Sequence, residues 1–149
     1  MRVYADTSFL ASWLYVNDTH HAKPSQWFIN HVTENWVVSP SSEFETINAV
    51  RGLCLRSPGP SKEYAEGLRR FFKHLFVEGP FEREDVNWDL VLRDAAQISA
   101  AHAATMKSRA ADILHVATLE QLNSDIFVSG DSDQVALATA RGFLAQAFC

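Results

Sequence analysis

The sequence predicts an α/β protein, a three-layer α/β/α sandwich in which helices cover both faces of a central, mainly parallel sheet. Short β-prone runs alternate along the chain with longer segments of helical periodicity, a pattern typical of parallel sheets. The runs at residues 36–38 and 126–128 are apolar throughout, as expected of buried strands. A length of 149 residues with 47% hydrophobic residues predicts one domain over residues 1–149.

The first half of the chain begins with strand, acid and helix. Residues 2–5 form a β-prone run that ends at Asp6, and an apolar helical stretch follows over residues 9–16. Because Pro is tolerated in a first helical turn, Pro40 opens a helix directly after the strand at residues 36–38. Apolar residues at helical spacing predict a helix around Trp27, Phe28 and Val32, one over residues 41–55 through Phe44, Ile47, Val50 and Leu55, and one over residues 61–76 through Leu68, Phe71, Phe72 and Leu75.

Glycine and proline mark the breaks between later elements. Residues 57–61, with the sequence Ser-Pro-Gly-Pro-Ser, form a turn between helices and not a domain linker, because neither side is long enough to stand alone. Ser108 is the predicted N-cap of a helix over residues 109–122. The remaining elements are strands at residues 81–86, 126–128 and 143–148 and helices at residues 88–104 and 132–141.

Composition excludes several classes of protein. Cys54 and Cys149 are the only two cysteines, and their positions resemble neither a disulfide framework nor a zinc site. No apolar run approaches the roughly 20 residues of a membrane span. An acid at position 6 comes too early for a signal peptide. We therefore expect a cytoplasmic protein with free thiols and no membrane association.

The charge is acidic overall but uneven along the chain. A formal net charge of -5 argues against broad electrostatic binding of nucleic acid. One stretch is an exception, and its basic residues are Arg51, Arg56, Lys62, Arg69, Arg70 and Lys73. Taken alone, such a stretch is more often a solvated helix face than a surface that contacts phosphates.

Four acids lie where a parallel sheet builds its ligand sites, beyond the carboxyl ends of the strands. Asp6 and Asp131 each follow a predicted strand, and Glu45 lies in the helix after another. Asp112 interrupts an otherwise apolar helix, where an acid is seldom buried without a partner. His115 lies on nearly the same face, and such a histidine is more often a hydrogen-bonded core residue than a ligand. Four converging acids would repel one another, and Mg²⁺ or Mn²⁺ would offset that repulsion.

Three of the four acids also have a structural interpretation when taken alone, whereas Asp112 resists one. Asp6 and Asp131 have the position of helix caps or turn residues. Glu45 could be a surface glutamate, and the neighbouring Glu43 competes for the same role. Asp133 is the corresponding substitute for Asp131.

At these four positions the chain resembles the PIN-domain nucleases, specifically the VapC-type toxins of prokaryotic toxin-antitoxin pairs. The resemblance rests on the ordered segments Val3-Tyr4-Ala5-Asp6-Thr7-Ser8, Val38-Ser39-Pro40 leading to Glu45-Thr46-Ile47-Asn48-Ala49-Val50, Arg109-Ala110-Ala111-Asp112-Ile113-Leu114-His115 and Phe127-Val128-Ser129-Gly130-Asp131. The metal-binding acids of the family fall on Asp6, Glu45, Asp112 and Asp131. The spacing from Ser39 favours Glu45 over Glu43. The chain departs from the family at Gly130, where a bulkier residue is common, and in the turn at residues 58–60.

The resemblance implies a PIN-like α/β/α fold, a homodimer and a Mg²⁺- or Mn²⁺-dependent endoribonuclease that a VapB-like antitoxin neutralises. Such an enzyme would cleave RNA phosphodiesters with a metal-activated water, and Glu45 would position a water or act as base. One or two ions could be held. The side chains expected to order the acids are Thr7, Ser8, His115 and Ser129. The basic stretch would then guide the RNA backbone towards the acids.

Three other functions remain open at this stage. The chain could be a housekeeping PIN nuclease without an antitoxin, or a non-catalytic module that binds RNA or protein. A phosphohydrolase with Asp6 as covalent nucleophile is disfavoured, because such enzymes usually place a second acid two residues on, where this chain has Ser8.

Overall fold

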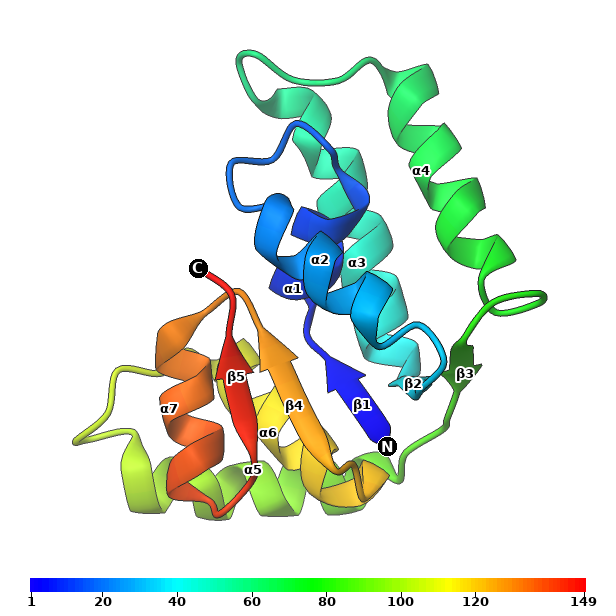
Figure 1. The fold of residues 1–149 in the computed structure, drawn as a ribbon. Helices are drawn as coiled ribbons and strands as arrows, with labels where there is room; N and C mark the ends of the chain where they lie inside the picture. Colours follow the sequence, from blue (N-terminus) through cyan, green and yellow to red (C-terminus); the bar gives the residue numbers. More distant parts are fainter.

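A computed structural model describes residues 1–149 and contains one five-stranded sheet (Figure 1). The strands are β1 (Arg2–Ala5), β2 (Asn35–Val38), β3 (Phe81–Arg83), β4 (Ile126–Ser129) and β5 (Ala145–Ala147). Their order is β3-β2-β1-β4-β5, and every neighbouring pair is parallel. The predicted parallel sheet is confirmed, with each predicted strand present and the third and fifth shorter than expected.

Helices cover both faces of the sheet, as the sequence predicts (Figure 1). One face carries α1 (Thr7–Leu14), α2 (Ala22–Asn30), α3 (Pro40–Gly52), the short 3-10 helix η1 (Leu53–Leu55) and α4 (Lys62–His74), and the other carries α5 (Trp88–His102), α6 (Ala110–Leu122) and α7 (Ser132–Ala140). Alternate strand residues serve the two faces. Val3 packs into the core under α1, whereas Tyr4 packs into the core under α6.

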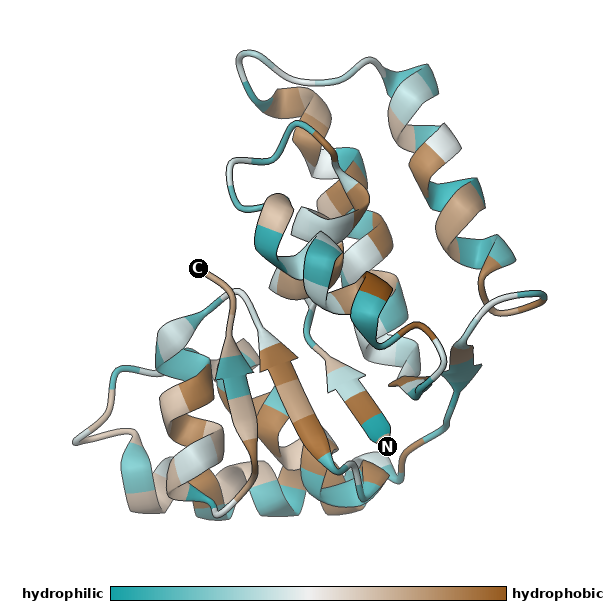
Figure 2. Cartoon of the chain, viewed as in Figure 1, coloured by the Kyte–Doolittle hydropathy of each residue, from teal (hydrophilic) through white to brown (hydrophobic).

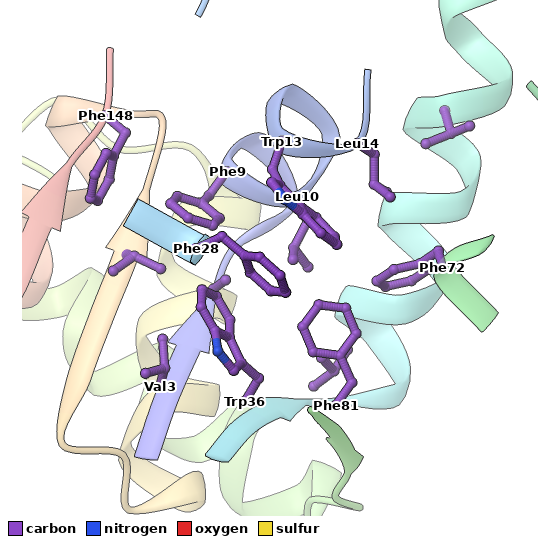
Figure 3. Close-up of a cluster of buried hydrophobic side chains, with 14 of the residues drawn as sticks. Val3, Phe9, Leu10, Trp13, Leu14, Phe28, Trp36, Phe72, Phe81 and Phe148 are labelled. Atoms are coloured by element: carbon purple, nitrogen blue, oxygen red, sulfur yellow. The ribbon is translucent and has the colours of Figure 1, made fainter. Parts of the chain in front are cut away.

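Aromatic rings fill the core on the α1 side of the sheet (Figure 3). Trp13 and Phe28 bring helices α1 and α2 together, with their ring centroids 4.2 Å apart. Phe9 lies between Trp36 of the sheet and Phe148 near the C-terminus, at centroid distances of 5.8 and 5.1 Å. Because Phe9 is fully buried in the first turn of α1, this packing fixes the start of the helix, and with it the residue at position 6.

Helix α3 buries a different face from the one that the sequence indicates. Phe44 and Leu55, both assigned to its apolar face, are 70% and 91% exposed. The buried side chains include Glu43 and Ser42 besides Val50. Polar partners on neighbouring elements stabilise this orientation, since Glu43 forms ion pairs with Lys73 and Arg83, and Ser42 shares a hydrogen bond with the hydroxyl of Tyr4. The α-helix also ends earlier than predicted, and η1 replaces its last turn.

Hydropathy follows these layers (Figure 2). Strand β4 is apolar along most of its length, whereas α4 carries polar and apolar residues side by side.

The prediction that Ser108 caps α6 is wrong. The residue before α6 is Arg109, and the hydroxyl of Ser108 instead donates to the carbonyl of Met106. None of the helices combines the length and the hydropathy that crossing a bilayer requires.

Candidate active site

The candidate site lies where the order of the sheet reverses. From β1 the chain builds β2 and β3 on one side, and it later adds β4 and β5 on the other. Ligands of parallel sheets bind at such a switch point, outside the carboxyl ends of the strands. Asp6 follows β1 as the N-cap of α1, and Asp131 follows β4 as the N-cap of α7. The two residues that the sequence placed at strand ends therefore flank this switch point.

Asp6 is a buried carboxylate surrounded by hydroxyl and amide donors. Its side chain is 4% exposed and accepts hydrogen bonds from Phe9 N at 2.9 Å, Ser8 Oγ at 2.7 Å and Ser129 Oγ at 2.9 Å. Burial raises the pKa of Asp6, and the nearby His115 and these hydrogen bonds offset the rise only in part. No Lys or Arg pairs with this carboxylate, so a cation placed beside it would favour its charged form.

Close packing holds the turn after β4 against Asp6. The amide of Gly130 donates to Ser8 Oγ at 2.8 Å, and the amide of Asp131 donates to Ser129 Oγ at 2.9 Å. A β-carbon at position 130 would lie only 3.0 Å from Ser8 Oγ. A side chain at this position would therefore require Ser8 to shift by a few tenths of an ångström.

Glu45 lies at one end of a chain of hydrogen bonds that links α3, α6 and β1 and is buried at Tyr4. His115 Nε2 lies 2.8 Å from Glu45 Oε2, and His115 Nδ1 lies 2.8 Å from the hydroxyl of Tyr4. The Tyr4 hydroxyl in turn lies 2.7 Å from Ser42 Oγ. Thr7 Oγ1 donates to the same Glu45 oxygen at 3.0 Å. Two donors therefore fix Oε2, while Oε1 makes no hydrogen bond within the protein.

Glu45 and His115 influence each other's ionisation. The hydrogen bond from His115 lowers the pKa of Glu45, although partial burial opposes the effect. Burial disfavours the charged form of His115, but Tyr4 and the carboxylates of Glu45 and Asp6 outweigh burial and raise its pKa. The arrangement therefore favours a glutamate that stays ionised and keeps one orientation.

Asp112 and Asp131 are joined through one arginine. Asp112 accepts from the backbone N of Arg109 at 2.7 Å, which caps the start of α6. The Arg109 Nη2 lies 3.2 Å from Asp112 Oδ1 and 3.0 Å from Asp131 Oδ2. A positive charge thus lies between two of the predicted acids. Carboxylate oxygens are the ligands that hard divalent cations prefer, and in this structure the Arg109 guanidinium lies between the two carboxylates.

One cavity of about 470 Å³ collects most of the predicted site. Asp6, Glu45 and Asp112 line it, together with the predicted supporting residues Thr7, Ser8 and His115. Asp131 does not line the cavity and reaches it only through Arg109. No three acidic, histidine or cysteine side chains are close enough to enclose a metal ion. The four acids thus share one region but are not drawn into a closed cage.

The substitute acids lie outside this cavity. Glu43 is buried on the other side of α3, where it pairs with Lys73 and lies 3.5 Å from Arg83. Asp133 pairs with the exposed Lys107 at 2.7 Å. These ion pairs hold Glu43 and Asp133 away from the acid cavity, whereas Glu45 and Asp6 line it.

The predicted RNA contacts are spread over several surfaces. Arg56 alone among them lines the acid cavity. Arg51 and Lys62 border a separate hollow between α3 and α4, and Arg51 pairs with Glu66 at 3.0 Å. Arg69 also pairs with Glu66, at 2.6 Å, Lys73 pairs with Glu43, and Arg70 is exposed.

Sequence reasoning missed Arg109 and Tyr4 as parts of the site. Arg109 was named only as the start of a helix, although a basic residue three positions before Asp112 has the spacing of an ion pair across one helical turn. No sequence pattern marked Tyr4, because the position of a tyrosine in a strand does not indicate which distant residues its hydroxyl will contact.

Comparisons with known proteins identify the family. The profile of the family described as PIN domain matches residues 3–140. The chain therefore belongs to the PIN domain family. A comparison with curated protein sequences finds no significant match.

Solved structures with the same fold are available for comparison. VapC20 from Mycobacterium tuberculosis, described as a sarcin-ricin loop cleaving toxin, is 18% identical with a TM-score of 0.68, and the match covers 95% of this chain and 96% of that one. FitAB bound to an IR36 DNA fragment is 20% identical with a TM-score of 0.68, covering 97% and 94%. VapBC2 from Rickettsia felis, bound to a DNA fragment from its promoter, is 11% identical with a TM-score of 0.68, covering 100% of both chains.

Nucleases of the PIN domain family generally depend on divalent metal ions. The donor set described above is compatible with that dependence, because it consists of carboxylate and hydroxyl oxygens, which hard cations prefer. Histidine enters it only through the hydrogen bond to Glu45.

Proposed function

We propose that this chain is a single PIN domain, residues 1–149, that acts as a Mg²⁺- or Mn²⁺-dependent endoribonuclease and as the toxin of a VapBC-type pair. The observation that carries the proposal is the convergence of Asp6, Glu45 and Asp112 on one cavity at the switch point of the sheet, with Asp131 joined to Asp112 through Arg109. The fold shared with VapC20, described as a sarcin-ricin loop cleaving toxin, supports the choice of RNA as substrate.

The chain's own residues account for the positions of the reacting groups. Asp6, Asp112 and Asp131 would hold the cation, with Glu45 beside them. The free Oε1 of Glu45 is available to accept a proton from the attacking water, since Oε2 is already held by Thr7 and His115. A bound divalent cation would lower the pKa of that water and offset the charge that develops on the phosphate oxygens.

The proteins that share the fold support a proposal for the partners. FitAB and VapBC2 are two-component complexes bound to DNA fragments. By analogy, the chain would form a homodimer and be neutralised in the cytoplasm by a cognate VapB-like antitoxin. Co-expression with the neighbouring reading frame tests this partner, because growth arrest that the neighbour relieves is the behaviour of a toxin, and indifference favours a housekeeping nuclease.

A cleavage assay tests the activity itself. Purified protein should cleave RNA with Mg²⁺ or Mn²⁺ and lose this activity in EDTA. Asp6→Asn should abolish cleavage, while its amide oxygen still accepts from Phe9 N and caps α1. Asp133→Asn is the matched control, because Asp133 lies outside the cavity and pairs with Lys107. A fully active Asp6→Asn variant would contradict the proposed site, and a folded wild type that binds but never cleaves RNA would indicate a binding module.

A further inference from the structure

A second cavity opens beside the one that holds the acids. It has a volume of about 660 Å³ and lies between the loop after α1 and the turn that precedes α4. Asp18 and Arg56 line both cavities. The two spaces therefore meet at this pair, and a ligand that leaves the acids in that direction must pass Arg56.

At the junction of the two cavities, Asp18 accepts a hydrogen bond from one N–H group of Arg56, and the other N–H groups of Arg56 stay available. Arg56 Nη1 donates to Asp18 Oδ2 at 3.1 Å. Hydrogen bonds from His20 N and Arg56 lower the pKa of Asp18, even though burial acts in the opposite direction. Asp18 is thus an ionised anchor, whereas the Arg56 side chain is 57% exposed. A guanidinium has five N–H donors in a planar fork, so donors remain to bind a phosphate at the junction.

An aromatic ring lines the second cavity but not the first. Tyr64 in the first turn of α4 is 43% exposed, and it contacts the buried Tyr15 edge to face at a centroid distance of 6.2 Å. Pro58 and Pro60 line the cavity beside it. Between them, a β-carbon on Gly59 would lie 2.5 Å from the carbonyl oxygen of Leu53. Only glycine fits so close an approach, which means that this wall is packed against η1.

The acid pocket, a fork of arginine donors and an aromatic ring thus follow one another along one groove. We propose that the second cavity is a base-binding subsite, in which an unpaired base of the RNA strand stacks on Tyr64 while Arg56 binds a phosphate between that base and the scissile bond. This inference rests on the proposed ribonuclease function. Stacking on an aromatic ring and phosphate contact are the two ways in which proteins hold single strands. Asn17, Thr19 and Ser57 line the same cavity and can hydrogen-bond a base edge.

Binding of RNA in the absence of cleavage tests the subsite directly. In the Asp6→Asn background, fluorescence anisotropy with labelled single-stranded RNA hexamers would compare Tyr64→Ala and Tyr64→Phe. Tyr64→Ala should weaken binding about 5- to 150-fold, the range observed when a stacking ring is removed, and Tyr64→Phe should bind like its parent. Trp88→Ala is the matched control, since Trp88 is also a partly exposed aromatic residue but lies on α5, away from both cavities.

The expected pattern is specific to a stacking site. Equal binding by Tyr64→Ala and Trp88→Ala would overturn the inference, as would the absence of RNA binding by every form. Circular dichroism and thermal unfolding check that Tyr64→Ala is folded. Arg56→Gln provides a second variant, which should weaken binding and reduce its dependence on salt concentration because one phosphate contact is lost.

Cleavage by the active protein separates this inference from the proposed function. Mapping of RNA ends should show that Tyr64→Ala still cleaves but has a changed base preference next to the cut. An unchanged preference would overturn the subsite while leaving the ribonuclease function intact. Failure of the wild type to cleave any RNA with metal would contradict the proposed function, and the binding experiment would still report on the second cavity.

Discussion

Removal of one buried hydroxyl should weaken both the fold and the candidate site. Tyr4→Phe deletes the hydrogen bonds to Ser42 Oγ and to His115 Nδ1, at 2.7 and 2.8 Å. Ser42 keeps its hydrogen bond to Ser39 Oγ at 2.9 Å, whereas His115 Nδ1 has no other partner. One orphaned buried group costs about 1–3 kcal/mol. A central value of ~2 kcal/mol corresponds to a fall in Tm of about 4–8 °C for a chain of this size.

The same substitution should slow cleavage. Without Tyr4 to fix its ring, His115 orients Glu45 less well, and loss of a residue that supports a metal site typically costs about 10–100-fold in activity or metal affinity. Thermal unfolding and single-turnover RNA cleavage measure the two effects. Tyr64→Phe is the control for stability, because its exposed hydroxyl makes no hydrogen bond within the protein and should change unfolding by less than about 0.5 kcal/mol. Equal stability of Tyr4→Phe and Tyr64→Phe would refute the role assigned to the hydrogen bonds between Tyr4, His115 and Ser42.

Three further predictions address other contacts. Ser129→Ala should lower the free energy of unfolding by about 1–3 kcal/mol, whereas Ser124→Ala, which removes a buried hydroxyl without a partner, should not lower it; urea denaturation compares them. Glu43→Gln should lower the free energy of unfolding by about 1–2 kcal/mol, since the basic partners of Glu43 are partly exposed. It should leave kcat unchanged, and a large loss of kcat would argue for Glu43 as part of the site. Arg109→Gln should tighten Mn²⁺ binding about fivefold, the effect of removing one competing charge in water-like surroundings; weaker binding by calorimetry would contradict this reasoning.

Features that depend on neighbours in the sequence were predictable. Short apolar runs and the acids that follow them are encoded within a few residues, so the strands and the positions of Asp6 and Asp131 at their ends could be derived directly. The rule that parallel strands end at one edge then brought these acids near each other. The roles of the four acids in catalysis remain predictions.

Features that depend on distant partners were not predictable. The orientation of α3 follows from Glu43 meeting Lys73 and Arg83, which belong to α4 and to β3. Hydrophobic periodicity alone favoured Phe44 as a core residue, and it lies in solvent. The second cavity likewise arises where a loop after α1 meets the turn before α4, a meeting that no local pattern encodes.

The position of three acids at helix starts has a consequence for how the protein matures. Backbone amides already hydrogen-bond Asp6 at α1, Asp112 at α6 and Asp131 at α7. Amides and the positive ends of the helix dipoles favour these negative charges. In small zinc domains, by contrast, the fold forms only once the metal binds. We therefore predict that this chain folds without metal, and that a divalent cation, where one binds, binds to the folded protein.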